Sequence, residues 1–264
     1  MKVIVCIKQV PDTVEVKIDP ETNTLIREGV SSIINPFDMY AIEEAVKLKE
    51  KFGLETIVLT MGPPQAGSAL REALSLGIDK AIHLCDRAFA GSDTWVTSFI
   101  LAKAIEKINN FDLVICGKQA SDGDTAQVGP GIAAHLNLPQ ATYVRRIDTV
   151  HFDTTPKVMV VERLLEEGYE LLELSLPAVI TVVKEINEPR LPSLRGKMKA
   201  RGADIPLWTN RDLDMEEEKI GLSGSPTQVI KIFTPPHKEG GKVFQGDPVD
   251  TVDKLMEEIK DLIH

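Results

Sequence analysis

The chain has 264 residues, of which 43% are hydrophobic and 27% charged, which is the composition of a globular protein with a buried core. Its formal net charge of -10 repels phosphate backbones and argues against nucleic acid as a partner. No apolar run approaches the ~20 residues of a membrane span, and the start MKVIVCIKQV turns polar too early for a signal peptide. The three scattered cysteines, Cys6, Cys85 and Cys116, favour a reducing compartment such as the cytoplasm.

The first half of the chain alternates short apolar runs with amphipathic stretches. The apolar runs are typical of buried parallel strands, and the amphipathic stretches have helical spacing. We expect strands at 3–7, 56–60, 81–84 and 113–116 and helices at 37–52, 65–76, 92–108 and 125–136, with a hairpin at 14–28. This alternation predicts an α/β fold: a Rossmann-like, mostly parallel sheet with helices on both faces.

The pattern changes after Leu138. Four consecutive strands without intervening helices, at 141–147, 157–163, 169–176 and 178–183, predict an antiparallel extension of the sheet. Residues 187–201 predict a surface loop or a short exposed helix. A segment rich in Gly, Pro and charge, with one strand at 229–233, leads to a closing amphipathic helix that starts near Val252. We therefore predict a nucleotide-binding domain over 1–201 and an extended arm with a C-terminal helix over 202–264.

The segment ICGKQASDGDTAQVGPG, residues 115–131, is the strongest candidate for a ligand site. It runs from the end of an apolar strand through a polar loop into a helix, and ligands of open α/β sheets lie at that edge. Free N–H groups at the helix start favour a phosphate. The alternative is an ordinary loop that ends in a capped helix, with Asp124 as the N-cap. The residues alone leave the two interpretations open.

Three other segments follow strand ends on the same edge of the predicted sheet. They are Lys8-Gln9, the helix entry at residues 35–38, and the turn at residues 61–64. Each alone is explained by turn chemistry, with Asn35 as a helix cap. Together with residues 117–128 they outline one nucleotide-sized pocket.

Constellations of catalytic or metal-binding residues are missing from the sequence. The five histidines have no metal-ligand spacing, and there is neither a G-x-S-x-G nucleophile motif nor a Walker A motif. Residues 129–134 match G-x-G-x-x-A but do not directly follow a strand, so we discount them. We predict no catalytic residue and no metal ligand, so that a bound cofactor would supply the chemistry.

The segment VERLLEEGYELLELSLPAVITVVKEINEPRLPSLRGKMKAR, residues 161–201, closely resembles the small (beta) subunit of electron-transferring flavoproteins. VIVCIKQVPDT at the start, SSIINPFDMYAIEEAVKLKE, LTMGPPQAGSALREALSLGIDKAIHL and ICGKQASDGDTAQVG also look like that family, so the resemblance covers nearly the whole chain. It implies a heterodimer with a larger alpha subunit, contacted by the C-terminal arm, and a nucleotide in the small subunit.

Two kinds of member are implied by this family. In ordinary members the small-subunit nucleotide is structural AMP. In electron-bifurcating members it is an FAD that takes hydride from NADH, so that NAD(H) is a transient substrate, and electrons go to ferredoxin or flavodoxin and to the other flavin. By position, the resemblance assigns the nucleotide to Cys6, Lys8, Asn35, Asp38, Met61, Gly117, Lys118, Gln119, Ala120, Asp122, Gly123, Asp124, Thr125, Ala126, Gln127 and Val128.

The small residues Gly123 and Ala126 leave room for the larger ligand, and the 121–130 loop looks like the bifurcating type. FAD is therefore the expected cofactor, with AMP as the alternative, and NADH oxidation is expected only in the heterodimer. A third hypothesis from another class is an ATP-binding signalling module similar to universal stress proteins. Those modules are shorter and lack a segment like 161–201.

Residues 187–201 correspond to the loop with which the family docks on a flavin dehydrogenase, acyl-CoA, lactate or similar. The resemblance implies that Leu194 is the anchor, with Arg195 and Lys197 on its basic rim. The alternative is a solvated loop whose leucine packs on its own domain. The segment ends KMKARG where the family often has a longer lysine run, which leaves the dehydrogenase open.

Overall fold

The computed structural model describes residues 1–12, 31–230 and 240–262. The chain divides into two compact units, Met1–Ile230 and Lys231–His264. The first unit holds the sheet, both hydrophobic cores and every residue predicted to contact a nucleotide or a dehydrogenase.

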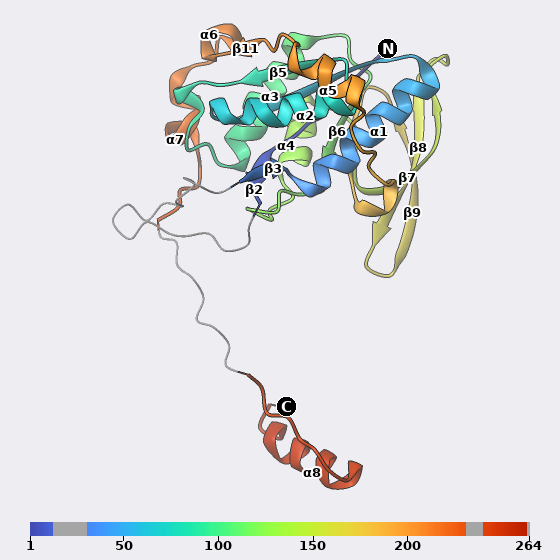
Figure 1. The fold of residues 1–264 in the computed structure, drawn as a ribbon, viewed down its shortest axis with the longest axis vertical. Helices are drawn as coiled ribbons and strands as arrows, with labels where there is room; N and C mark the ends of the chain where they lie inside the picture. Colours follow the sequence, from blue (N-terminus) through green and yellow to red (C-terminus); the bar gives the residue numbers. More distant parts are fainter. Residues whose placement is uncertain (13–30, 231–239, 263–264) are drawn as a thin grey trace. The chain divides into compact units, whose positions relative to one another are not determined.

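The first unit is built on a nine-stranded sheet with the order β11-β5-β4-β1-β6-β10-β7-β8-β9 (Figure 1). The strands from β11 to β7 are parallel, whereas β8 and β9 are antiparallel to their neighbours. Their bounds are β1 (Lys2–Cys6), β4 (Glu55–Met61), β5 (Lys80–Leu84), β6 (Leu113–Gly117), β7 (Gln140–His151), β8 (Val158–Leu165), β9 (Gly168–Ser175), β10 (Ala178–Val182) and β11 (Leu207–Trp208). The predicted fold class is confirmed.

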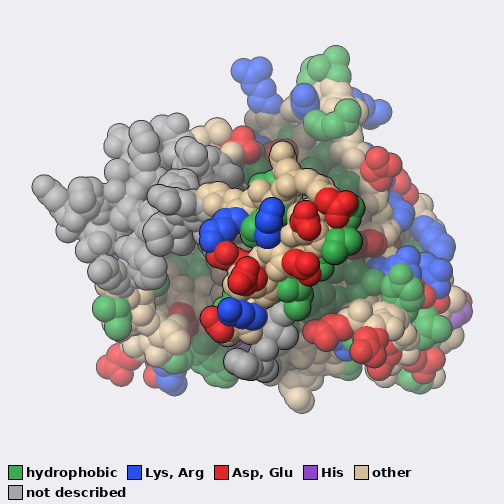
Figure 2. All heavy atoms as spheres, turned by 90° about the horizontal axis from the view of Figure 1, so that it is seen from below, with side chains coloured by type: hydrophobic (Ala, Val, Ile, Leu, Met, Phe, Trp, Pro, Cys, Tyr) green, Lys and Arg blue, Asp and Glu red, His purple; other side chains and the backbone are tan. Residues whose placement is uncertain are grey.

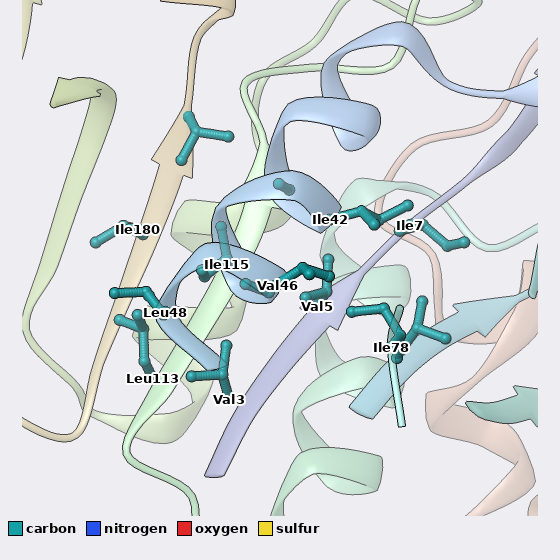
Figure 3. Close-up of a cluster of buried hydrophobic side chains, with 14 of the residues drawn as sticks. Val3, Val5, Ile7, Ile42, Val46, Leu48, Ile78, Leu113, Ile115 and Ile180 are labelled. Carbon is teal, nitrogen blue, oxygen red and sulfur yellow. The ribbon is translucent and has the colours of Figure 1, made fainter. Parts of the chain in front are cut away.

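Helices cover both faces of this sheet. Helices α1 (Pro36–Phe52) and α2 (Gly67–Leu76) pack in one hydrophobic cluster, and α3 (Thr94–Ile108) and α4 (Val128–Leu136) pack in the other. Figure 3 shows Ile42, Val46 and Leu48 of α1 beside Val3 and Val5 of β1. Helix α1 starts with proline at its first turn and ends at Gly53, whose left-handed φ of 67° closes the helix.

The last of the four consecutive strands departs from the expectation. Strand β10 was predicted within the antiparallel extension, but it lies parallel between β6 and β7. All five of its residues are buried, and the run AVITV is typical of a central strand that is covered on both faces. The antiparallel extension consists of β7, β8 and β9, and Figure 1 shows it at one end of the sheet.

Residues 184–230 continue the first unit in short elements. These are η3 (Lys184–Ile186), α5 (Leu194–Arg201), β11, α6 (Asn210–Leu213), η4 (Glu217–Lys219) and α7 (Gly221–Gly224). Strand β11 pairs with β5, and Met215 and Ile220 are buried, so residues 202–220 pack on the sheet domain. Shorter elements elsewhere are β2 (Gln9–Pro11), β3 (Ser32–Ile34), η1 (Pro64–Ala66) and η2 (Arg87–Phe89).

Two expectations fall partly or wholly outside the described residues. The hairpin at 14–28 lies outside them, although β2 and β3, on either side of that segment, pair antiparallel. Of the strand predicted at 229–233, only Val229 and Ile230 are described, and neither is in a strand. In the second unit, α8 (Pro248–Ile259) begins four residues before Val252 because Asp247 caps its N-terminus ahead of Pro248.

Candidate functional site

The carboxyl ends of β1, β4 and β6 form the edge where the sequence predicts a ligand. In register, Cys6 of β1 pairs with Leu59 of β4 and with Cys116 of β6, so the segments that follow these strands emerge side by side. A pocket of about 110 Å³ opens there, lined by residues that include Lys8, Met61 and Asp122. Residues 8–9, residues 61–63 and Asp122 thus line one pocket, whereas residues 35–38 and the rest of 117–128 do not line it.

Asn35 joins the start of α1 to residues 117–128, which we call the nucleotide loop. Its side-chain Nδ2 donates to the carbonyl of Gln119 at 2.8 Å, and its Oδ1 accepts from the backbone N–H of Ser121 at 3.0 Å. Asn35 occupies the N-cap position of α1 but makes no side-chain cap hydrogen bond there. Because this side chain is buried and satisfied by the loop backbone, it positions the loop and is not free to bind a ligand.

Asp38 lies beneath the same edge and is also buried. Its Oδ2 accepts the backbone N–H of Lys8 at 2.7 Å. Burial raises the pKa of the Asp38 carboxyl to about 7, although hydrogen bonds from Lys8, Asn35 and the backbone of Gly117 act in the opposite direction. A Cβ on Gly117 would overlap Asp38 Oδ1 and stand 2.7 Å from the carbonyl carbon of Phe37, so only glycine fits at this crossing.

The nucleotide loop is exposed from Ser121 to Thr125. Asp124 and Ala126 have left-handed φ angles of 53° and 54°, which are uncommon for residues other than glycine. Helix α4 begins at Val128 with Gln127 as its N-cap, so the helix start near Thr125 and the capping role of Asp124 were wrong. The left-handed residues turn the chain away before the helix can begin.

An ion pair narrows the pocket. Lys8 Nζ lies 2.6 Å from Asp122 Oδ1. At about 110 Å³ the pocket is smaller than the ~300 Å³ at which small-molecule sites begin. A wider hollow of about 700 Å³ lies between α3 and residues 212–219, but its lysines already bind Glu106, Glu216 and the carbonyl of Asp212. We therefore place the candidate site at the strand ends.

The structure places the predicted cofactor residues in two layers. Cys6, Asn35 and Asp38 are buried below the edge, whereas Lys8 and the nucleotide loop lie at the surface. The pocket also contains Gln65 and Ser32, which the sequence analysis missed. Gln65 comes four residues after the end of β4, so a search of the residues that follow each predicted strand would have identified it. Ser32 does not follow a predicted strand, and the sequence gives no reason to select it.

Residues 187–201, which we call the docking segment, form a loop and helix α5 on the first unit. Leu194 is 77% exposed, so it does not pack on its own domain. Arg195 and Lys197 are exposed beside it. The sequence analysis missed Arg190 as a structural residue: it binds two carboxylates of α1, Glu43 and Glu50.

The surface carries charges of both signs. Figure 2 shows acidic, basic and hydrophobic side chains interspersed on the face that it draws. Within residues 1–12, 31–230 and 240–262, no cluster of His, Cys, Asp and Glu could hold a metal ion. None of the helices in those same ranges has the length and hydropathy that crossing a membrane requires.

Comparison with known proteins assigns the chain to a family. The model of the electron transfer flavoprotein domain matches residues 22–213. An electron transfer flavoprotein subunit beta of Thermoanaerobacterium thermosaccharolyticum is 50% identical over 260 residues, which cover 98% of each chain. Subunit CarD of the caffeyl-CoA reductase-Etf complex of Acetobacterium woodii is 51% identical over 253 residues, covering 96% of this chain and 95% of its own length.

A third relative, Protein FixA of Sinorhizobium fredii, is 45% identical over 264 residues, covering 98% of this chain and 90% of its own. Matches of this length and identity exclude the signalling-module hypothesis and confirm the resemblance drawn from residues 161–201. The chain therefore belongs to the beta-subunit family of electron transfer flavoproteins.

Proposed function

We propose that this chain is the beta subunit of a cytoplasmic, electron-bifurcating flavoprotein and binds FAD at the strand-end pocket. Membership of the beta-subunit family implies an alpha-subunit partner. FAD bound there would accept hydride from NADH and pass electrons to ferredoxin or flavodoxin and, through the flavin of the alpha subunit, to or from a dehydrogenase. The three cysteines are free thiols, which suits a reducing cytoplasm.

The observation that carries the proposal is the anchoring of the nucleotide loop. Asn35 fixes two backbone groups of that loop, and Asp38 fixes the backbone of Lys8 and Gly117, so the ends of β1 and β6 are held together. Residues 121–125 remain exposed at the surface, where a nucleotide can reach them, while the backbone N–H groups of Ser121, Gly123 and Asp124 hold the loop through bonds within the protein. A polar, preorganised loop at the carboxyl edge of a parallel sheet is the usual position for such a ligand.

The residues at the pocket fit a nucleotide if the ion pair between Lys8 and Asp122 opens. Lys8 is the cation at the pocket and is suited to a phosphate, but it is paired with Asp122. A nucleotide would bind with the Lys8–Asp122 pair opened and the exposed part of the loop displaced. The small side chains of Gly123 and Ala126 impose little bulk on the ligand, and a Cβ on Gly123 would meet no atom within 4 Å.

Structural AMP is the alternative ligand, because a pocket that accepts the adenylate part of FAD also accepts AMP. The bifurcating assignment is favoured by the relative named as part of a caffeyl-CoA reductase-Etf complex, in which an Etf is joined to a reductase. In both cases the chain's own residues bind and orient the nucleotide; none is proposed to break or form a covalent bond.

Counting the nucleotides tests the choice between FAD and AMP. The heterodimer is purified, extracted with acid, and the released nucleotides are separated and counted per complex. Two FAD and no AMP support the proposal, and one FAD with one AMP replaces it by the alternative. As a functional check, NADH oxidation should require both ferredoxin or flavodoxin and an electron acceptor of the dehydrogenase branch.

We propose that the docking segment binds a flavin dehydrogenase through Leu194, with Arg195 and Lys197 on the rim. The exposed leucine and the basic side chains around it support this role. The dehydrogenase for the assay is the one that exchanges electrons fastest with the wild-type heterodimer in a panel of acyl-CoA and lactate dehydrogenases. Leu194→Ala should raise the KM for the heterodimer about tenfold without changing its nucleotide content. An unchanged KM would refute docking through Leu194.

A further inference from the structure

Arg190 connects the docking segment to α1 through two carboxylates. Its guanidinium binds Glu43 at 2.8 and 3.0 Å and Glu50 at 2.6 and 3.0 Å, so both pairs are bidentate. Its backbone N–H adds a bond of 3.1 Å to Glu43. Glu43 and Glu50 are seven residues apart and therefore lie on one face of α1. We call this arrangement the arginine clamp.

The clamp is one of several attachments of the docking segment to the rest of the first unit. Just before it, Asn187 Nδ2 donates to the carbonyl of Tyr40 and to Glu44, both at 3.0 Å. At the other end of the segment, Arg71 Nη1 donates to the carbonyls of Ala200, at 2.9 Å, and of Ala203, at 3.1 Å. The docking segment is thus attached to α1 at its start and to α2 at its end.

Helix α5 also lies very close to α2. A Cβ on Gly196 would overlap the carbonyl oxygen of Ser75, so glycine is required where the two helices touch. Ala200, one turn later, is buried in the core beneath. The face of α5 that carries Gly196 and Ala200 is therefore fixed on the body, which determines which face points outward.

The outward face presents an apolar ridge. Leu194 and Met198, four residues apart in α5, are 77% and 70% exposed, and Leu191 before the helix is 90% exposed. Three large apolar side chains at such exposure, on a segment fastened at both ends, are unusual for a surface that meets only water. We call these three residues the apolar ridge.

Basic side chains border the ridge on both sides. On α5, Arg195 and Lys199 follow one side of Leu194 and Met198, and Lys197 follows the other. The docking segment has five basic residues and one acidic residue, whereas the whole chain has a net charge of -10. The complementary surface is an apolar groove with an acidic rim.

We propose that Arg190 is a positioning residue, which holds the apolar ridge preformed for docking into an apolar, acid-rimmed groove of the redox partner. This inference rests on the proposed docking function. Without the clamp, the segment between η3 and α5 would sample other conformations, and docking would have to restore one of them. Arg190 itself need not contact the partner, because its guanidinium is occupied by α1.

Amide hydrogen exchange on the heterodimer tests the clamp directly. In Arg190→Gln, amides of residues 187–201 should exchange about tenfold faster or more, because charge-assisted hydrogen bonds are lost and Glu43 is left buried without its cation. Arg190→Lys should be intermediate, since an ammonium cannot make the bidentate contacts. Amides of β1 and β6 should be unaffected. Arg146→Gln is the matched control: it removes an arginine of β7 that pairs with Asp148 of the same strand and with Glu162 of β8, and it should leave residues 187–201 unchanged.

Electron-transfer kinetics with the dehydrogenase selected above complete the test. Arg190→Gln should raise the KM for the heterodimer about tenfold with kcat within about twofold and nucleotide content unchanged, and Arg190→Lys should recover part of the loss. Unchanged exchange in Arg190→Gln overturns the clamp. If Arg190→Gln exchanges faster but keeps its KM, while Leu194→Ala raises KM, the role of the clamp in docking is overturned. An unchanged KM in Leu194→Ala instead refutes the proposed docking surface itself.

Discussion

Helix α1 fastens two surface segments, and it does so by different means. Near its N-terminal end, Asn35 and Asp38 hold backbone groups of the strand ends and the nucleotide loop. One to four turns further along, Glu43 and Glu50 hold the docking segment through a single side chain, Arg190. One helix thus positions both surfaces that the proposed function requires.

The difference determines what each segment tolerates. The nucleotide loop is held by its backbone, so its exposed side chains can change while its path is kept. The docking segment is held by side-chain hydrogen bonds, those of Arg190 above all, and by close helix contact at Gly196. We expect substitutions in the loop to alter ligand affinity, and substitutions beneath either segment to alter its geometry.

The largest expected effect comes from the charge of Asp38. Its folded-state pKa is about 7, above the ordinary 3.8, so the folded state binds the proton more tightly than the unfolded chain. Stability from this group is therefore complete below pH 3.8 and is lost as the pH rises to about 7, by about 4 kcal/mol in total. Urea unfolding of wild type and Asp38→Asn from pH 4 to 8 checks this.

The quantity to compare is the unfolding free energy of the wild type minus that of Asp38→Asn, because the contributions of other titrating groups cancel in this difference. That difference should fall with rising pH and level off above pH 7. A difference that is independent of pH would show that the Asp38 carboxyl titrates normally, and that the hydrogen bonds around it offset its burial.

The second-largest effect is expected where the end of β6 crosses the start of α1. Gly117→Ala puts a Cβ onto Asp38 Oδ1 and close to Phe37, so it should destabilise the protein by about 3 kcal/mol and reduce bound nucleotide. Gly123→Ala is the matched control, since its Cβ would meet nothing within 4 Å; it should change stability by less than about 0.5 kcal/mol. Thermal unfolding measures the stability of both variants, and nucleotide content is measured for Gly117→Ala. Equal effects of the two would contradict backbone anchoring.

Both glycines lie in one motif, and the sequence alone could not tell which of them is required by its surroundings. The sequence analysis singled out Gly123, in the middle of a polar loop, as a small residue that leaves room for a ligand. The structure shows Gly117 at a tight crossing and puts the left-handed conformations at Asp124 and Ala126 instead. Local pattern predicts a loop, but the atoms that crowd a glycine come from α1, some 80 residues earlier in the chain.

The same reasoning explains what could be predicted of the fold. Strands β1, β4, β5 and β6 were predicted within about one residue, because apolar periodicity reports burial directly. The position of β10 between β6 and β7 was not predicted, because the order of strands in a sheet depends on contacts between distant parts of the chain and not on local periodicity. Asn35 was read as a helix cap for a similar reason: its partners Gln119 and Ser121 are distant in sequence.

A smaller effect is expected at the end of the docking segment. Arg71→Ala removes the donor shared by the carbonyls that end α5, and should cost about 1 kcal/mol of local stability. Amides near the end of α5 should exchange severalfold faster, while nucleotide content stays the same. Arg87→Ala, at an exposed arginine of η2, is the control. Loss of nucleotide in Arg71→Ala would show that the two surfaces are not independent.

The smallest expected effect concerns the ion pair at the pocket. Asp122→Asn removes a negative charge beside the proposed phosphate site and frees Lys8. Because a partly exposed ion pair contributes about 0.2–1 kcal/mol, AMP should bind roughly 1.4- to fivefold more tightly to the nucleotide-stripped heterodimer. Isothermal titration calorimetry measures this.

Two variants make this result specific to the pocket. Asp153→Asn removes the same charge at the turn between β7 and β8 and should leave AMP affinity unchanged, which separates a local effect from net charge. Lys8→Met should weaken AMP binding, because it removes the cation instead of its competitor. If Asp122→Asn and Lys8→Met shifted affinity in the same direction, Lys8 would not be the phosphate contact, and the pocket would have to hold its ligand through the loop backbone alone.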